Sequence, residues 1–253
     1  MLQHIRVLCQ RAFFIATFFA IWATCGHVME IPEYILPKPD SVAETLFADR
    51  WLLWVHFLDT AKNWSAGLAV SILVASSLSL MAFASKTLER HVSRFLVVSQ
   101  AVPYLTVAPL LLLWFGLGSA PKIVLIVLTC SFPIAQLTLA GLHQARGKYS
   151  VLATILRLTP QKALKQLYIP AALPSFMEGV RISVTYAFVS SVLAELIGSE
   201  SGLGVYLSRA QSAYRTDRVV AVVFVIVLFS LMCSWLTKAM TSKLVFWESK
   251  SNV

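Results

Sequence analysis

Long uncharged runs of apolar residues constrain this chain more than any other feature. Five runs contain no Asp, Glu, Lys or Arg, and a sixth carries only the carboxylate of Glu195. They cover residues 12–29, 64–85, 95–115, 123–142, 182–198 and 219–237. Because about 20 mostly apolar residues carry a helix across about 30 Å of hydrocarbon, these runs predict an all-α membrane protein with six transmembrane helices. Residues 1–253 then form a single transmembrane domain.

The composition excludes a soluble enzyme. Of the 253 residues, 58% are hydrophobic and 13% are charged, whereas average chains carry about 25% charged residues. Such a chain has too few polar residues to cover a soluble surface. The net charge of +9 would suggest nucleic acid in a soluble protein, but in a membrane protein it indicates basic cytoplasmic loops. We therefore expect membrane lipid, and no nucleic acid, as a partner.

The distribution of Lys and Arg predicts the orientation in the membrane. With the N-terminus in the cytoplasm, the inner segments hold 14 of the 21 basic residues, as the positive-inside rule requires. Six spans then place the C-terminus in the cytoplasm as well. The predicted spans themselves contain no Lys or Arg. No cationic side chain within them therefore indicates an anionic substrate.

The cytoplasmic loop at 143–181 is long and carries six of the basic residues. Loops of this length tend to have a function. Apolar residues at a three-to-four spacing predict a short helix over 149–158. Thr159 followed by Pro160 supplies an N-cap hydroxyl and a proline for the start of a second helix, which we expect to end near Pro170. One role open to this basic, amphipathic pair of helices is to anchor the loop on lipid headgroups.

A few polar side chains within the runs are candidates for a translocation path: Gln100, Tyr104, Thr106, Gln136 and Thr138. Such groups more often bond to a neighbouring helix than to a substrate. Prolines at 103, 109 and 133 predict bent helices, either lining a path or packed with ordinary kinks. Glu195 has two readings, because it could line the path or hold the outer end of its helix near residues 198–204.

An intramembrane enzyme is the main alternative class of protein. It would need a nucleophile with a base, or paired carboxylates, at one depth. Glu195 stands alone in its span, so we assign no catalytic, cofactor-binding or metal-binding residues. The chain also contains no Gly-x-x-x-x-Gly-Lys-Ser/Thr and cannot cradle ATP phosphates by itself.

Four short motifs follow one another in a recognisable order. ILPKP occupies 35–39 after the first run, Pro103 precedes PLLLLWFGLG at 109–118, YIPAALP occupies 168–174 ahead of GVR at 179–181, and Glu195 precedes GLG at 202–204. Together with six spans, they resemble binding-protein-dependent ABC import permeases. Within that family, they resemble the nitrate/sulfonate/taurine branch, which includes thiamine-precursor members.

The resemblance implies that two copies of the chain move a small solute across a bacterial inner membrane by alternating access. A separate ATP-binding subunit would drive transport, and a periplasmic or lipid-anchored binding protein would deliver the solute. The solute would be a sulfonate, taurine, nitrate or a thiamine-precursor pyrimidine. The loop 143–181 would couple to the ATPase through Ala153, Leu158, Ala163, Leu164, Leu167, Pro170 and Gly179.

Two positions depart from the pattern of the family. Counting back from Pro170, the glycine of the coupling loop falls at Arg157 and its acidic residue falls at Val151. The coupling loop of the family begins with an acidic residue followed by two alanines, and of these three residues only Ala153 is present here. Because an arginine adopts a positive φ at a cost, we expect the bend between the loop helices to lie at 158–160 instead.

Overall fold

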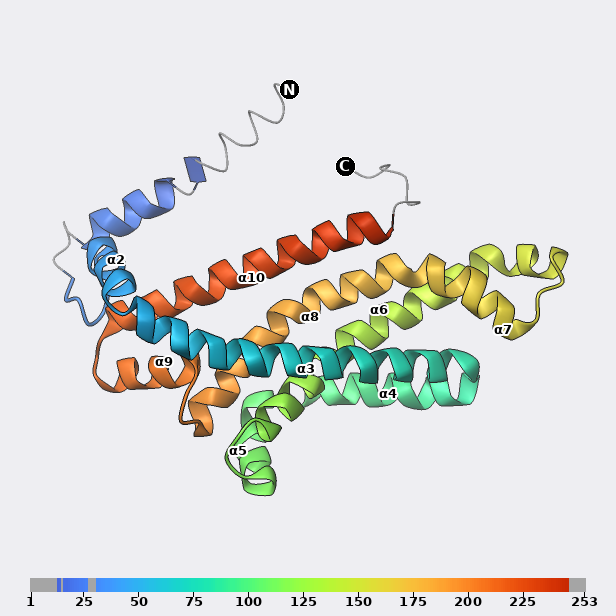
Figure 1. Ribbon diagram of the computed structural model, residues 1–253, viewed down its shortest axis with the longest axis horizontal. Helices are drawn as coiled ribbons and strands as arrows, with labels where there is room; N and C mark the ends of the chain where they lie inside the picture. The colour runs from blue at the N-terminus through green and yellow to red at the C-terminus, as the bar shows by residue number, and fades with distance from the viewer. Residues whose placement is uncertain (1–12, 15, 27–30, 246–253) are drawn as a thin grey trace.

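The described part of the chain is a helical bundle. The computed structural model describes residues 13–14, 16–26 and 31–245, and all regular elements within these ranges are helices. After a short apolar helix at Ala16–Gly26 come α2 (Pro39–Ala48), α3 (Arg50–Ala84), α4 (Lys86–Ala101), α5 (Tyr104–Phe115), α6 (Ala120–Ile155), α7 (Pro160–Ala163), the π-helical turn η1 (Leu164–Tyr168), α8 (Ile169–Gly198), α9 (Leu203–Ser212) and α10 (Thr216–Leu244). The long helices run side by side along the bundle (Figure 1).

Four segments of the described chain are long and apolar enough to cross a membrane: Arg50–Ala84, Ala120–Ile155, Pro160–Gly198 and Thr216–Leu244. They contain the predicted spans 123–142, 182–198 and 219–237, and all of 64–85 except Ser85. Their helices extend beyond those predictions, since a helix does not end where its first charged residue appears. The first predicted span, 12–29, lies partly outside the described residues, so six spans and cytoplasmic termini stay predictions.

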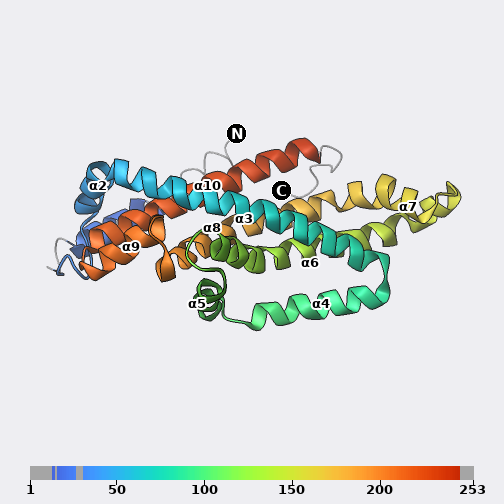
Figure 2. The same cartoon turned by 60° about the horizontal axis from the view of Figure 1, so that its bottom comes forward.

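The predicted span over 95–115 is bent, as its prolines indicated, and whether it crosses the membrane stays a prediction. This segment is split between α4 and α5, and the two helices are bent by 105°. Val102 is extended, with φ −81° and ψ 121°, because the ring of Pro103 excludes a helical conformation in the residue before it. The pair counts as a fifth span only if a broken helix crosses the membrane. In two views α4 lies along the side of the bundle opposite α10 (Figures 1 and 2).

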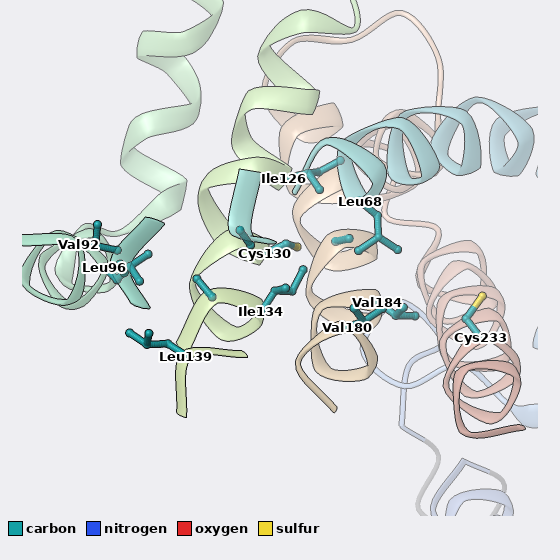
Figure 3. Close-up of a cluster of buried hydrophobic side chains, with 14 residues drawn as sticks. Leu68, Val92, Leu96, Ile126, Cys130, Ile134, Leu139, Val180, Val184 and Cys233 are labelled. Atoms are coloured by element: carbon teal, nitrogen blue, oxygen red, sulfur yellow. The ribbon is translucent and has the colours of Figure 1, made fainter. Parts of the chain in front are cut away.

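The centre of the bundle is the packing of α6 between α8 and α3. Its core contains Ile126, Cys130 and Ile134 of α6 and Val180 and Val184 of α8 (Figure 3). Small residues permit the close approach, as is usual between membrane helices. A Cβ on Gly179 would lie 2.9 Å from the Cα of Ile134. Gly179 therefore belongs to this helix crossing, and not to the predicted loop.

Candidate functional sites

One end of the bundle is a helical arm, which we define as residues 143–168. Figure 1 shows its tip, with α7, projecting beyond the other helices. The predicted loop is thus helical: residues 143–155 continue α6 without a break, in place of the separate helix expected over 149–158. The second helix does not end near Pro170 either. Pro170 lies directly after the π-helical turn η1, inside a helical segment that runs from Pro160 to Gly198.

The tip of the arm turns on Arg157, which adopts φ +49°. The Arg157 N–H donates to the carbonyl of Thr154 and the Leu158 N–H donates to that of Ala153, both at 3.0 Å. These two bonds form a Schellman motif, in which glycine is the usual residue at the left-handed position. The expectation that the arginine avoids this conformation is wrong, because the paired bonds offset its strain. The N-cap is confirmed: Thr159 Oγ1 accepts from the Lys162 N–H at 3.4 Å.

Replacing Arg157 by glycine is expected to stabilise the protein by about 1 kcal/mol, because glycine adopts a positive φ without the Cβ clash. The midpoint of thermal unfolding in detergent should rise by about 2–4 °C. Arg157→Ala serves as the control, since it removes the same side chain but keeps the strained Cβ. An equal rise in both variants would show that the charge, and not the backbone, is responsible.

The inner face of the arm is a small apolar cluster. Ala153 and Ala163 are buried in it, together with Leu142, Ala145, Tyr168 and Ala172, and Leu158, Leu164 and Leu167 pack against it half-buried. Five of the seven predicted ATPase contacts therefore pack within the arm itself: Ala153, Leu158, Ala163, Leu164 and Leu167. The two alanines pack between α6 and α7 and also line the groove beside the arm, so the predicted ATPase contacts stay predictions.

The outer face of the arm is apolar and exposed. Val151 and Ile155, one helical turn apart, are 69% and 71% exposed, and Leu156 follows at 54%. A separate groove of about 500 Å³ lies between α6 and α7, and its lining includes four of the predicted ATPase contacts: Ala153, Leu158, Ala163 and Leu164. The sequence analysis missed this face, although the apolar i, i+4 pair at the end of a basic helix was its signal. An exposed apolar patch on such a projection is suited to bind another protein.

At the other end of the bundle, Glu195 holds a turn. Its side chain is 1% exposed, and its Oε2 accepts hydrogen bonds from Thr60 Oγ1 at 2.9 Å and from the Gly204 N–H at 3.0 Å. The Leu203 N–H donates to Thr60 Oγ1 at 2.9 Å. This arrangement favours the second reading of Glu195, in which the carboxylate holds residues 198–204 against α3.

His56 completes the same network, because its Nδ1 accepts from the Gly202 N–H at 3.1 Å. The sequence analysis missed both His56 and Thr60. Their only signal was a four-residue spacing on α3, which places them on one buried face of the helix.

The other path candidates lie apart from Glu195. Gln100 of α4, Thr106 of α5 and Gln136 of α6 are exposed, whereas Tyr104 is half-buried. The Thr106 hydroxyl donates to the carbonyl of Pro103 at 2.7 Å. Thr138 is buried and donates to the Ile134 carbonyl at 2.5 Å, the bond within a helix that is common for such residues. A path role for the exposed three stays a prediction.

Hydrogen bonds and ion pairs join α2, α3, α9 and α10 at the end of the bundle that carries α2 and α9. Asp49 accepts from the Tyr206 hydroxyl at 2.7 Å and pairs with Arg218 at 2.9 Å. Burial, reinforced by the hydrogen bond to Asp49, raises the pKa of Tyr206. Arg215 pairs with Asp217 at 2.7 Å. Within the described ranges, no group of three or more His, Cys, Asp or Glu residues could hold a metal ion.

Comparison with known proteins was made by family, sequence and fold. Residues 67–245 match the family described as "Binding-protein-dependent transport system inner membrane component". A probable ABC transporter permease protein of Haemophilus influenzae is 35% identical over 83% of this chain and 86% of its own length. The formylaminopyrimidine transport permease protein ThiX of Halalkalibacterium halodurans is 31% identical, over 94% of this chain and 95% of its own.

Two further similarities concern a more distant relative and a solved structure. The taurine transport system permease protein TauC of Escherichia coli is 27% identical over 93% of this chain and 88% of its own length. A chain of the MetNI methionine ABC transporter, in an inward-facing conformation, superposes with a TM-score of 0.69 at 16% identity, covering 78% of this chain and 98% of that one. The second similarity is one of fold.

Proposed function

Because this chain belongs to the family of binding-protein-dependent transport inner membrane components, in its nitrate/sulfonate/taurine branch, we propose that two copies of it form the translocation path of an ABC importer. The chain is a multi-pass membrane protein, and its relatives are transport permease subunits and not enzymes. The path would open alternately to the two sides, in a bacterial inner membrane.

The exposed apolar face of the arm supports a separate ATPase as the partner. Val151, Ile155 and Leu156 project at the tip of a rigid helical element, where a second protein can both bury them and move them. The basic residues of 143–181 support a cytoplasmic location for this end, and ATP is found there. A binding protein, periplasmic or lipid-anchored, would then dock at the opposite end, near α2 and α9.

The substrate class follows from the relatives. They are named for formylaminopyrimidine, aliphatic sulfonates and taurine, all small polar solutes. We propose a solute of that size for this chain, either a thiamine-precursor pyrimidine or a sulfonate-type anion.

Purification of the chain together with the ATPase and binding protein encoded beside it tests the proposal. We expect a stable complex whose ATP hydrolysis in liposomes rises when the binding protein is loaded with its solute. Hydrolysis that ignores the loaded binding protein, or a chain that binds no ATPase, would contradict the proposed function.

A further inference from the structure

An apolar groove of about 360 Å³ opens between α3 and α10. Eight of its nine described lining residues are apolar, and the ninth is Arg50. The rings of Phe57 and Phe229 line it, with centroids 4.9 Å apart, and Phe229 also packs on the buried Phe188 of α8 at 4.7 Å. These rings separate the groove from the core of the bundle. The volume lies in the range of sites for small ligands.

Arg50 gives the groove a positive charge that the chain leaves open to a ligand. Its Nη1 donates to the carbonyl of Phe47 at 2.8 Å, and the guanidinium lies 4.6 Å from the centre of that ring. The neighbouring Asp49 is engaged by Tyr206 and Arg218. Within the described ranges, no carboxylate comes within 4.0 Å of the Arg50 guanidinium. Most of its five N–H donors can therefore bind an external phosphate, which an arginine accepts in a two-pronged geometry.

The surface around Arg50 has the character of a membrane interface. Trp51 and Trp54, three residues apart on α3, are 73% and 50% exposed, and tryptophan gathers at the level of lipid headgroups. From Arg50 to Phe57 the groove follows α3 for about 10 Å, alongside the candidate span Thr216–Leu244. It thus leads from the headgroup level toward the hydrocarbon. The sequence analysis missed it, because these residues precede the predicted span 64–85.

The groove lies on the side of the bundle that faces away from the path candidates. The exposed candidates Gln100, Thr106 and Gln136 belong to α4, α5 and α6, and α4 lies opposite α10 in both views (Figures 1 and 2). Two copies that enclose a path between these candidates leave the groove facing the bilayer. This step rests on the proposed function, and it favours lipid over a second copy of the chain as the occupant.

We propose that this groove binds one acyl chain of an anionic phospholipid, with the phosphate paired to Arg50. The chain would cover the apolar walls that Leu53 and Leu228 contribute from the two helices. The phosphate would accept the open N–H donors of the guanidinium. A lipid with a net negative charge fits better than a zwitterionic one, because Arg50 has no carboxylate partner among the described residues.

The probe is dioleoylphosphatidylglycerol, added to the purified full-length chain in a mild non-ionic detergent. At about ten times its dissociation constant, we expect the midpoint of thermal unfolding to rise by about 3–6 °C. Dioleoylphosphatidylcholine has the same acyl chains and no net charge, so it should bind more weakly in the same titration. Glycerol phosphate supplies a phosphate without acyl chains and should give no rise.

Two variants test the two halves of the site separately. Arg50→Gln should weaken the binding of phosphatidylglycerol at least tenfold, because charge-assisted hydrogen bonds are lost. Lys62→Gln is its control, since it removes the same charge from an exposed position further along α3. Leu228→Trp should fill the groove and abolish the response. Leu231→Trp adds the same ring to α10 at a position of equal exposure outside the groove and should keep the response.

Three results would overturn the site: equal affinity for the two phospholipids, a rise with glycerol phosphate, or equal responses of the two tryptophan variants. The readout needs no ATPase, so it separates this inference from the proposed function. Uptake by the assembled importer without any lipid response overturns the lipid site alone. A lipid response in a chain that binds no ATPase overturns the proposed function alone.

Discussion

Replacing Gly202 by alanine is expected to leave little folded protein. Gly202 has φ +116° and ψ 165°, a conformation essentially confined to glycine. A Cβ there would lie 2.2 Å from the carboxylate carbon of Glu195, which cannot retreat because Thr60 and Gly204 hold it. Strain and overpacking together cost about 3 kcal/mol or more, a large share of the stability of a typical domain.

The measurement is the yield of monodisperse protein in detergent and its thermal unfolding midpoint. Gly147→Ala is the matched control, because Gly147 lies inside α6 with no atom within 4 Å of an added Cβ. That change should be neutral or stabilising by about 1 kcal/mol. Similar behaviour of the two variants would mean that the turn at 202 is not held as described.

Replacing Ile155 by aspartate is expected to lower solute uptake by the assembled importer at least tenfold while leaving the chain folded. Ile155 is 71% exposed at the tip of the arm, so the change costs the isolated chain little. In the complex it would bury a carboxylate in an apolar interface, and a buried unpaired charge is strongly unfavourable. Uptake into liposomes and ATPase binding, measured on the same preparation, report the effect.

Two controls separate binding from folding in that experiment. Gln144→Asp adds the same charge to an exposed position of α6 about three turns away and should leave uptake unchanged. Ala153→Asp places the charge in the buried cluster and should lower the unfolding midpoint as well as uptake. Normal uptake by Ile155→Asp would exclude this face as the ATPase contact.

The helical class of the fold followed from hydropathy, and four of the predicted spans lie within long helices. Hydropathy alone indicates neither where a helix bends nor how far it extends, although the proline at 103 did predict a bend. The break at Pro103 depends on the extended residue before it. α6 continues to Ile155 because it stays helical outside the membrane. Hydropathy identifies only the part of a helix that crosses the membrane.

The ATPase contacts predicted for the arm stay predictions. The motif around 153–170 did mark the projecting arm, yet a motif cannot say which side of a short helix faces outward. Ala153 was expected at a partner surface and is 7% exposed at the wall of a groove, while Ile155 was not proposed and is exposed. Contacts between distant segments, such as Thr60 with Glu195 or Lys122 with Ser199, arise only when the chain is folded.

The length of α6 has a mechanical consequence. From Lys122 to Ile155 it is one helix of about 50 Å, and it crosses α8 closely where Ile134 meets Gly179. That crossing is a natural fulcrum, about 18 Å from the lysine and about 32 Å from the tip. A rigid tilt about it would move the tip nearly twice as far as the lysine, and in the opposite direction. The helix would thus act as a lever that converts a large swing of the arm into a smaller movement at the start of α6, with Pro133 inside the helix beside the fulcrum.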